Sequence, residues 1–159
     1  MTPVLTTALA VLGTLLGATV TGVFQHLAAG RTERSAARAR SRQDALDAVA
    51  DLASADSAHR QALHTRLEAK LFGTAADAEL FELRTASHVT RAATKRPYTL
   101  VRLLVPDPGV RATADAMITA TYDMVDATTP AELDAAQERS RTAHDRFIDT
   151  AAEFFAAER

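Results

Sequence analysis

The side chains best suited to acid–base or metal chemistry are the histidines, of which the chain has five. His59 and His64 are five residues apart and therefore lie on different faces of a helix, so they are poorly placed to share a metal ion. His64 and Glu68 are four residues apart and share one face, but the same spacing is typical of an ion pair on a helix surface. His88 and His144 have no neighbouring partner in the sequence. We therefore expect no metal site.

Other catalytic patterns are missing from the sequence as well. No serine lies in a nucleophile-elbow motif, and there is no glycine-rich loop of the kind that holds phosphates. The chain has no cysteine, which excludes disulfides and thiolate metal sites. We expect no enzymatic activity and no cofactor.

A basic segment between residues 84 and 102 contains no acidic residue and is the candidate contact for a nucleic acid or a protein partner. Its basic residues are Arg84, Arg91, Lys95, Arg96 and Arg102. Clustered arginine and lysine side chains suit phosphate contacts, but base stacking needs interleaved aromatic residues, and only Tyr98 is present. The segment from 107 to 159 carries eleven acids against five arginines. Charge pairing with this acidic segment, inside a bundle or between subunits, is the interpretation that the sequence favours.

The elements that position these residues begin with a long uncharged stretch from Pro3 to Gly30. Residues 4–24 alone are enough to cross a hydrocarbon core of about 30 Å as a helix. Five arginines follow within residues 31–42, which by the positive-inside bias places the N-terminus outside and the remainder in the cytoplasm. We predict a single-pass protein of the cell membrane. A cleaved signal peptide and a buried soluble helix are the alternatives.

The uncharged stretch also carries small residues on one helix face. Such a face lets two helices approach closely in lipid, which predicts a homo-oligomer. This predicted association face consists of Gly13, Gly17 and Thr21 together with Ala18 and Gly22. Chance occurrence in a span rich in glycine and alanine is the alternative.

The arginines after the stretch recur at intervals of three and four residues and form one stripe on a helix. Basic side chains near an anionic leaflet attract the lipid bilayer. The predicted membrane-surface residues are Arg31, Arg34, Arg38 and Arg42.

Helical spacing of apolar residues dominates the rest of the chain. A long helix is predicted over 31–72, followed by a glycine cap at Gly73. A second helix runs towards Val89, is interrupted at Pro97 and resumes after a kink. The turn at 106–109 precedes a third helix over 110–127, and Thr129 with Pro130 begins a fourth.

The predicted core positions lie on one stripe of each of the last two helices. Alternating spacing of three and four residues indicates antiparallel packing in a bundle. In the third helix the stripe comprises Val110, Ala114, Met117, Thr121 and Met124, and in the fourth Leu133, Ala136, Ser140, Ala143, Phe147, Ala151 and Phe154.

The sequence thus predicts an all-α protein with a single N-terminal transmembrane helix followed by a cytoplasmic antiparallel helical bundle. The expected parts are the transmembrane helix (1–30), a basic juxtamembrane region with a long helix (31–72), and the remainder of the bundle (73–159).

Two segments resemble a known family. GTLLGATVTGVFQ at residues 13–25, followed by a helix rich in arginine and alanine, is similar to small Streptomyces proteins called KilB. HVTRAATKRPYTLVRLLVPDPGVRATADAMITATYDM at residues 88–124 is similar to them as well. The resemblance implies a link to conjugative plasmids, with a role in transfer and spread through the mycelium. It brings no catalytic residue with it.

Three functions remain open from the sequence. The first is a membrane-anchored, self-associating helical scaffold or channel-like component that serves plasmid transfer. The second is a membrane-tethered adaptor that binds nucleic acid through the basic segment. The third is an accessory subunit of a larger membrane complex, whose activity comes from a protein partner.

Overall fold

The longest element has no proline or glycine between Gly30 and Gly73, so nothing in that stretch interrupts helical hydrogen bonding. In the computed structural model, which describes residues 2–157 and side chains only from residue 33 onward, helix α1 extends over Thr2–Phe72. The chain divides into two compact units, 1–42 and 43–159. The first unit consists of the N-terminal part of α1. The second holds the rest of α1 and all later elements.

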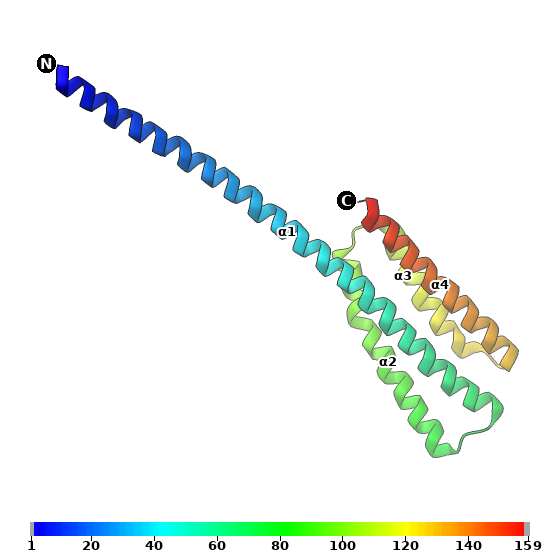
Figure 1. The fold of residues 1–159 in the computed structure, drawn as a ribbon. Helices are drawn as coiled ribbons and strands as arrows, with labels where there is room; N and C mark the ends of the chain where they lie inside the picture. The colour runs from blue at the N-terminus through cyan, green and yellow to red at the C-terminus, as the bar shows by residue number, and fades with distance from the viewer. Residues whose placement is uncertain (1, 158–159) are drawn as a thin grey trace. The chain divides into compact units, whose positions relative to one another are not determined.

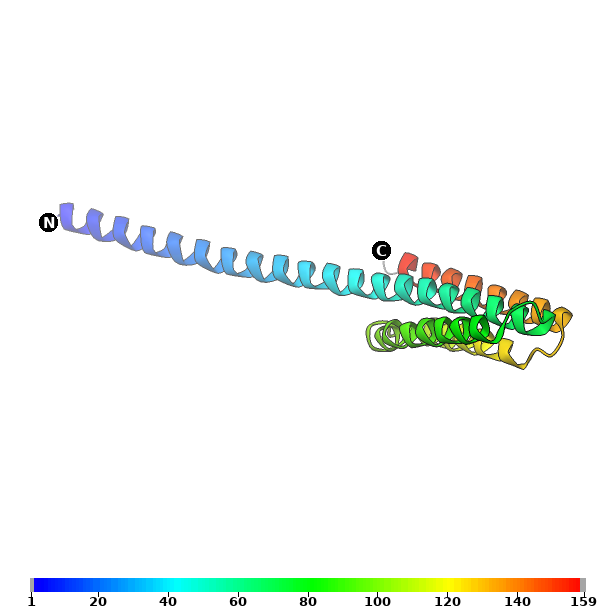
Figure 2. The same ribbon diagram turned by 90° about the horizontal axis from the view of Figure 1, so that it is seen from below.

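The second unit is an antiparallel bundle (Figure 1). Residues 43–72 of α1 are followed by α2 (Asp77–Leu104), α3 (Pro108–Tyr122), a short 3-10 helix η1 (Asp123–Asp126) and α4 (Pro130–Ala157). Successive helices run in opposite directions, and α3 and α4 lie lengthwise beside one another (Figures 1 and 2). The described part of the chain contains helices and no strand, which confirms the all-α prediction.

The core of the bundle lies along the inward stripes of the four helices. One cluster is centred on Leu52, Val101, Met117 and Phe147, all fully buried. A second, smaller cluster towards the α1–α2 turn consists of Leu63, Leu67, Met124, Leu133 and Ala136. All five core positions predicted for the third helix are buried. Burial of such side chains contributes about 1.5–3 kcal/mol each, which is what holds the helices together.

The end of α1 and the start of α4 follow the predicted capping signals, and α3 has a further cap at Asp107. Gly73 takes a positive φ of 63°, the left-handed conformation that ends α1. The Asp107 carboxylate accepts a hydrogen bond of 2.8 Å from the Val110 amide and so caps α3. Thr129 Oγ1 accepts from the Glu132 amide at 3.2 Å, while Glu132 Oε2 accepts from the Thr128 amide at 2.8 Å. These bonds fix the start of α4, as the sequence predicts.

Three local predictions need correction. Pro97 does not interrupt the second helix, because α2 continues through it to Leu104 with the ring buried in the core. The third helix ends at Tyr122, and the residues after it form the tighter η1. Near the end of α4 the buried aromatic residue is Phe155, and the predicted core residue Phe154 is half-buried against the same cluster.

The predicted membrane location is also corrected. No helix in the part of the chain that the structure describes is both long enough and apolar enough to cross a membrane. From residue 33 onward α1 carries charged side chains on successive turns, which breaks up its apolar residues. The prediction of a single-pass membrane protein with its N-terminus outside is therefore not upheld. The side chains of residues 3–30, on which that prediction depended, lie outside the described residues.

Candidate functional site

Helix α2 presents the predicted basic residues on two of its faces. Arg84, Arg91, Lys95 and Arg102 follow one another at helical intervals on one side of the helix, with His88 between the first two. Arg96 lies on a different side. All five predicted basic residues are exposed. The structure therefore gathers four of the five into one line, which we call the basic line (Arg84, Arg91, Lys95 and Arg102).

Two members of the basic line are held by tyrosines. The Arg91 guanidinium carbon lies 4.6 Å from the centroid of the Tyr122 ring, a cation–π arrangement. Arg102 donates a hydrogen bond of 3.3 Å to the Tyr98 hydroxyl, which itself donates to Asp115 at 2.6 Å. The hydrogen bond to Asp115 raises the pKa of Tyr98, because ionisation of the Tyr98 hydroxyl would remove the proton that forms this bond. The line is thus partly ordered by aromatic contacts.

The predicted pairing of these cations with the acidic fourth helix does not occur among the described residues of the chain. The ion pairs among the described residues are Arg60–Asp56, His64–Glu68, Arg141–Glu138 and His144–Asp56. None includes a basic residue of α2. In the part of the chain that the structure describes, the basic side chains of α2 therefore have no carboxylate within ion-pairing distance.

The face of α2 opposite its buried residues is apolar and exposed. Phe81 is 70% exposed, Val89 65% and Leu103 72%. Small or uncharged residues lie between them at helical spacing, and Arg96 is the charged residue on this face. We call this surface the outer face of α2: Ala78, Phe81, Thr85, Val89, Ala92, Arg96, Thr99 and Leu103.

The predicted sites near the N-terminus cannot be placed in the same way. The side chains of the predicted association face lie outside the described residues, namely Gly13, Gly17, Ala18, Thr21 and Gly22. Arg31 lies outside them too. Arg34 and Arg38 are exposed on α1, and Arg42 is half-buried. The roles predicted for these residues stay predictions.

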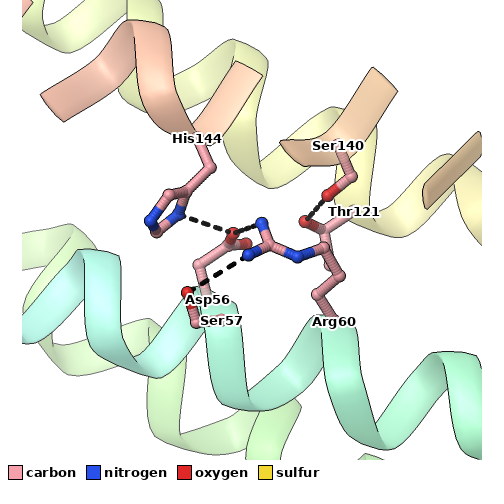
Figure 3. A network of polar contacts seen from close by, with 6 residues as sticks. All are labelled: Asp56, Ser57, Arg60, Thr121, Ser140 and His144. Atoms are coloured by element: carbon pink, nitrogen blue, oxygen red, sulfur yellow. Dashed lines mark hydrogen bonds and ion pairs between the residues drawn. The ribbon is translucent and has the colours of Figure 1, made fainter. Parts of the chain in front are cut away.

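A buried polar network crosses the bundle between α1, α3 and α4 (Figure 3). Asp56 is completely buried, and its Oδ2 lies 3.6 Å from Arg60 Nη1 and 3.6 Å from His144 Nδ1. Arg60 also donates a hydrogen bond of 3.3 Å to Ser57 Oγ. Neither carboxylate oxygen of Asp56 has a hydrogen-bond partner at ordinary distance. A charged group without hydrogen bonds in a core is costly to bury.

Burial dominates the chemistry of this carboxyl group. Loss of water raises the pKa of Asp56, and the Thr121 hydroxyl and the neighbouring Arg60 and His144 oppose that rise only in part. Thr121 and Ser140 share a hydrogen bond of 2.7 Å beside the network. The arrangement therefore holds a proton or a charge inside the bundle.

A small cavity lies where α1, α2 and the end of α3 meet. Its volume is about 130 Å³, and its walls are His59, Leu63, Arg66, Ser87, His88, Arg91, Tyr122 and Val125. The His59 ring is buried, packs edge-on against Tyr122 with ring centroids 5.8 Å apart, and shares a hydrogen bond of 3.1 Å with Thr90. Burial lowers the pKa of His59, and the charges of Arg91 and His88 lower it further.

Two of these features were missed in the sequence. The segment 56–60 looks like a polar interruption of the α1 stripe, yet Asp56 and His59 are buried. The signal was present in the regular spacing of the buried residues Ala45, Ala48, Leu52, Asp56, His59, Leu63 and Leu67.

His64 and Glu68 form a helix-surface ion pair of 3.8 Å, and no cluster of three or more metal-binding side chains occurs among the described residues.

Comparison with known proteins agrees with the resemblance found in the sequence. The family of KilB plasmid transfer proteins matches residues 46–155, which include all the buried residues of α2, α3 and α4. Protein KilB of Streptomyces lividans is 39% identical over 153 residues, covering 96% of this chain and 99% of that protein. No solved structure matches the chain. The chain therefore belongs to the KilB plasmid transfer protein family.

Proposed function

We propose that the chain serves plasmid transfer as a self-associating helical component, whose copies contact one another through the outer face of α2. Membership of the KilB family supports the role in transfer. The exposure of Phe81, Val89 and Leu103 on one side of a single helix supports the self-association.

The physical argument rests on the cost of hydrating apolar side chains. Contiguous apolar surface on a soluble domain is uncommon and typically marks an interaction site. Removing it from water releases roughly 25 cal/mol per Å². The outer face carries one charge, Arg96, along its length, so two copies of it can meet with little desolvation of charge.

Twofold symmetry makes this face self-complementary. In an isologous dimer, the same patch serves both partners, and a residue near one end of a helix meets the other end of its mate. An antiparallel pair of α2 helices would bring Phe81 of one copy near Leu103 of the other, with Val89 nearer the centre. The basic lines would then flank the contact and remain open to solvent.

A mating assay tests the proposal. A plasmid that lacks the gene for this chain is complemented with the wild type, with Val89→Glu, or with Ala50→Glu as a matched control at an exposed position of α1. Val89→Glu should reduce transfer, because it places a carboxylate in each half of the apolar contact. Transfer at the wild-type level with Val89→Glu would contradict the role of the outer face.

The basic line favours a second function, that of an adaptor that binds nucleic acid. Its four cations are exposed on one side of α2 and have no carboxylate partner among the described residues. Fluorescence anisotropy with duplex DNA at several salt concentrations tests this function. Lys95→Gln should lower the salt slope by about 1, whereas absence of binding at low salt would remove the adaptor function.

A further inference from the structure

The cavity beside His59 is lined by basic side chains. Four of its walls are formed by arginine or histidine, and no aspartate or glutamate lines it. The two arginines come from different elements, Arg66 from α1 and Arg91 from α2, and each of these helices adds a histidine, His59 and His88. Cations brought together from two helices around a confined space produce a strong local positive potential.

Among the described residues, the arginines of the cavity have no anionic partner. Neither Arg66 nor Arg91 forms an ion pair with any carboxylate in the region that the structure describes. Arg91 instead lies over the Tyr122 ring, which holds its guanidinium at the cavity wall. Arginine presents its donors as a planar fork suited to oxyanions, so two unpaired guanidinium groups beside one cavity leave unused binding capacity.

The shape of the cavity suits a small ligand. His59 and Ser87 form a buried floor, 3% and 4% exposed, while His88 and Arg91 at the rim are exposed to solvent. A volume of about 130 Å³ holds a few water molecules at roughly 30 Å³ each. A tetrahedral oxyanion fits such a space, whereas a nucleoside does not.

We infer that this cavity binds a phosphate group, either free inorganic phosphate or the terminal phosphate of a larger molecule. A phosphomonoester carries nearly two negative charges at neutral pH and therefore balances two guanidinium groups better than a carboxylate does. The hydroxyl of Ser87 and the imidazoles of His59 and His88 supply further hydrogen-bonding groups around it. The site does not depend on self-association through the outer face of α2.

Histidine NMR tests the site directly on the full chain. The Hε1 resonances are followed while sodium phosphate replaces sodium chloride at constant pH and ionic strength. Phosphate should shift the resonances of His59 and His88 in a saturable manner and leave those of His64 and His144, which do not line the cavity, unchanged. Absence of a saturable shift through the millimolar range would overturn the inference.

Matched arginine variants distinguish a built site from general charge screening. Arg66→Gln should weaken phosphate binding by at least about tenfold, because it removes a charge-assisted partner. Arg84→Gln removes an arginine of α2 that does not line the cavity and should leave binding unchanged. Equal weakening by both variants would overturn the inference, since it would show that only the overall charge matters.

Two oligonucleotides separate the sources of the phosphate. A short single strand with a 5′-phosphate is compared with the same strand without it. A shift of His59 with the phosphorylated strand but not with the unphosphorylated strand assigns the site to terminal phosphates. A shift with sodium phosphate but with neither strand assigns it to the free ion. Equal shifts with both strands would show that the site reads the phosphodiester backbone, and the assignment would be wrong.

Discussion

Oδ2 of Asp56 lies 3.6 Å from Nδ1 of His144, joining α1 to α4 at a completely buried position. The contact is too long for a hydrogen bond and is an ion pair whenever the imidazole is protonated. Arg60 approaches the same oxygen at the same distance from within α1. The bundle thus encloses a carboxyl group whose charge depends on pH.

Stability should fall as the pH rises through the titration of Asp56. Burial raises the pKa of this carboxyl group above its ordinary value of 3.8, so the folded chain binds the proton more tightly than the unfolded chain. The resulting stabilisation is complete below pH 3.8 and is lost as the pH rises through the raised pKa. Asp56→Asn has no carboxyl group to ionise and should gain stability relative to the wild type as the pH rises through the raised pKa. Urea denaturation from pH 4 to pH 8 measures the difference.

The opposite pH dependence of Asp56→Asn relative to the wild type would contradict this prediction. If Asp56→Asn lost stability relative to the wild type as the pH rose, the ionised carboxylate would be the favoured native form. Attraction by Arg60 and His144 would then outweigh desolvation.

Removing the arginine should be more damaging than removing the acid. Arg60→Gln leaves the buried Asp56 carboxylate with less compensating charge and should cost about 3 kcal/mol of unfolding free energy at neutral pH. In the double variant Asp56→Asn, Arg60→Gln, most of that loss should disappear, because no charge remains to be compensated. A double-mutant cycle measures this coupling, and additive losses would show that the two side chains act independently.

The cap of α3 gives a prediction with a closely matched control. Asp107→Ala removes the acceptor for the Val110 amide and should cost about 1 kcal/mol. Asp107→Asn keeps a side-chain oxygen at the same position and should retain most of the stability. Thermal unfolding of both variants measures the difference, and equal losses would show that the charge of Asp107, and not the hydrogen bond, stabilises the helix.

Neighbouring residues of α4 test the packing of the core. Phe147 is fully buried, whereas Ile148 is 42% exposed on the next position of the helix. Phe147→Ala should cost about 3–5 kcal/mol, and Ile148→Ala should cost well under half of that. Chemical denaturation measures both, and similar losses would mean that α4 does not turn Phe147 to the core and Ile148 towards solvent.

Local patterns in the sequence predict much of this fold, because capping residues and apolar stripes act within a few residues of each other. The stripe from Val110 to Met124 and the caps at Gly73 and Thr129 are examples. The continuation of α2 through Pro97 could not be predicted, since tertiary packing of the buried ring outweighs the lost hydrogen bond.

The sites are harder to predict because they depend on contacts between helices. Asp56 and His144 are 88 positions apart, and nothing near either residue indicates the other. The cavity likewise combines His59 with Arg91 and Tyr122, each of which has an ordinary local sequence. The basic segment of α2 was visible, but its division into a basic line and an outer face required the position of the buried side of the helix.

The central claim, self-association through the outer face of α2, is tested most directly by sedimentation equilibrium of the full chain. A chain of 17.0 kDa should sediment as a dimer or larger species in the wild type and in Ala50→Glu. It should sediment as a monomer in Val89→Glu, with an unchanged melting temperature of the bundle. A wild-type chain that remained monomeric across the accessible concentrations, or a Val89→Glu chain that still associated, would contradict the account.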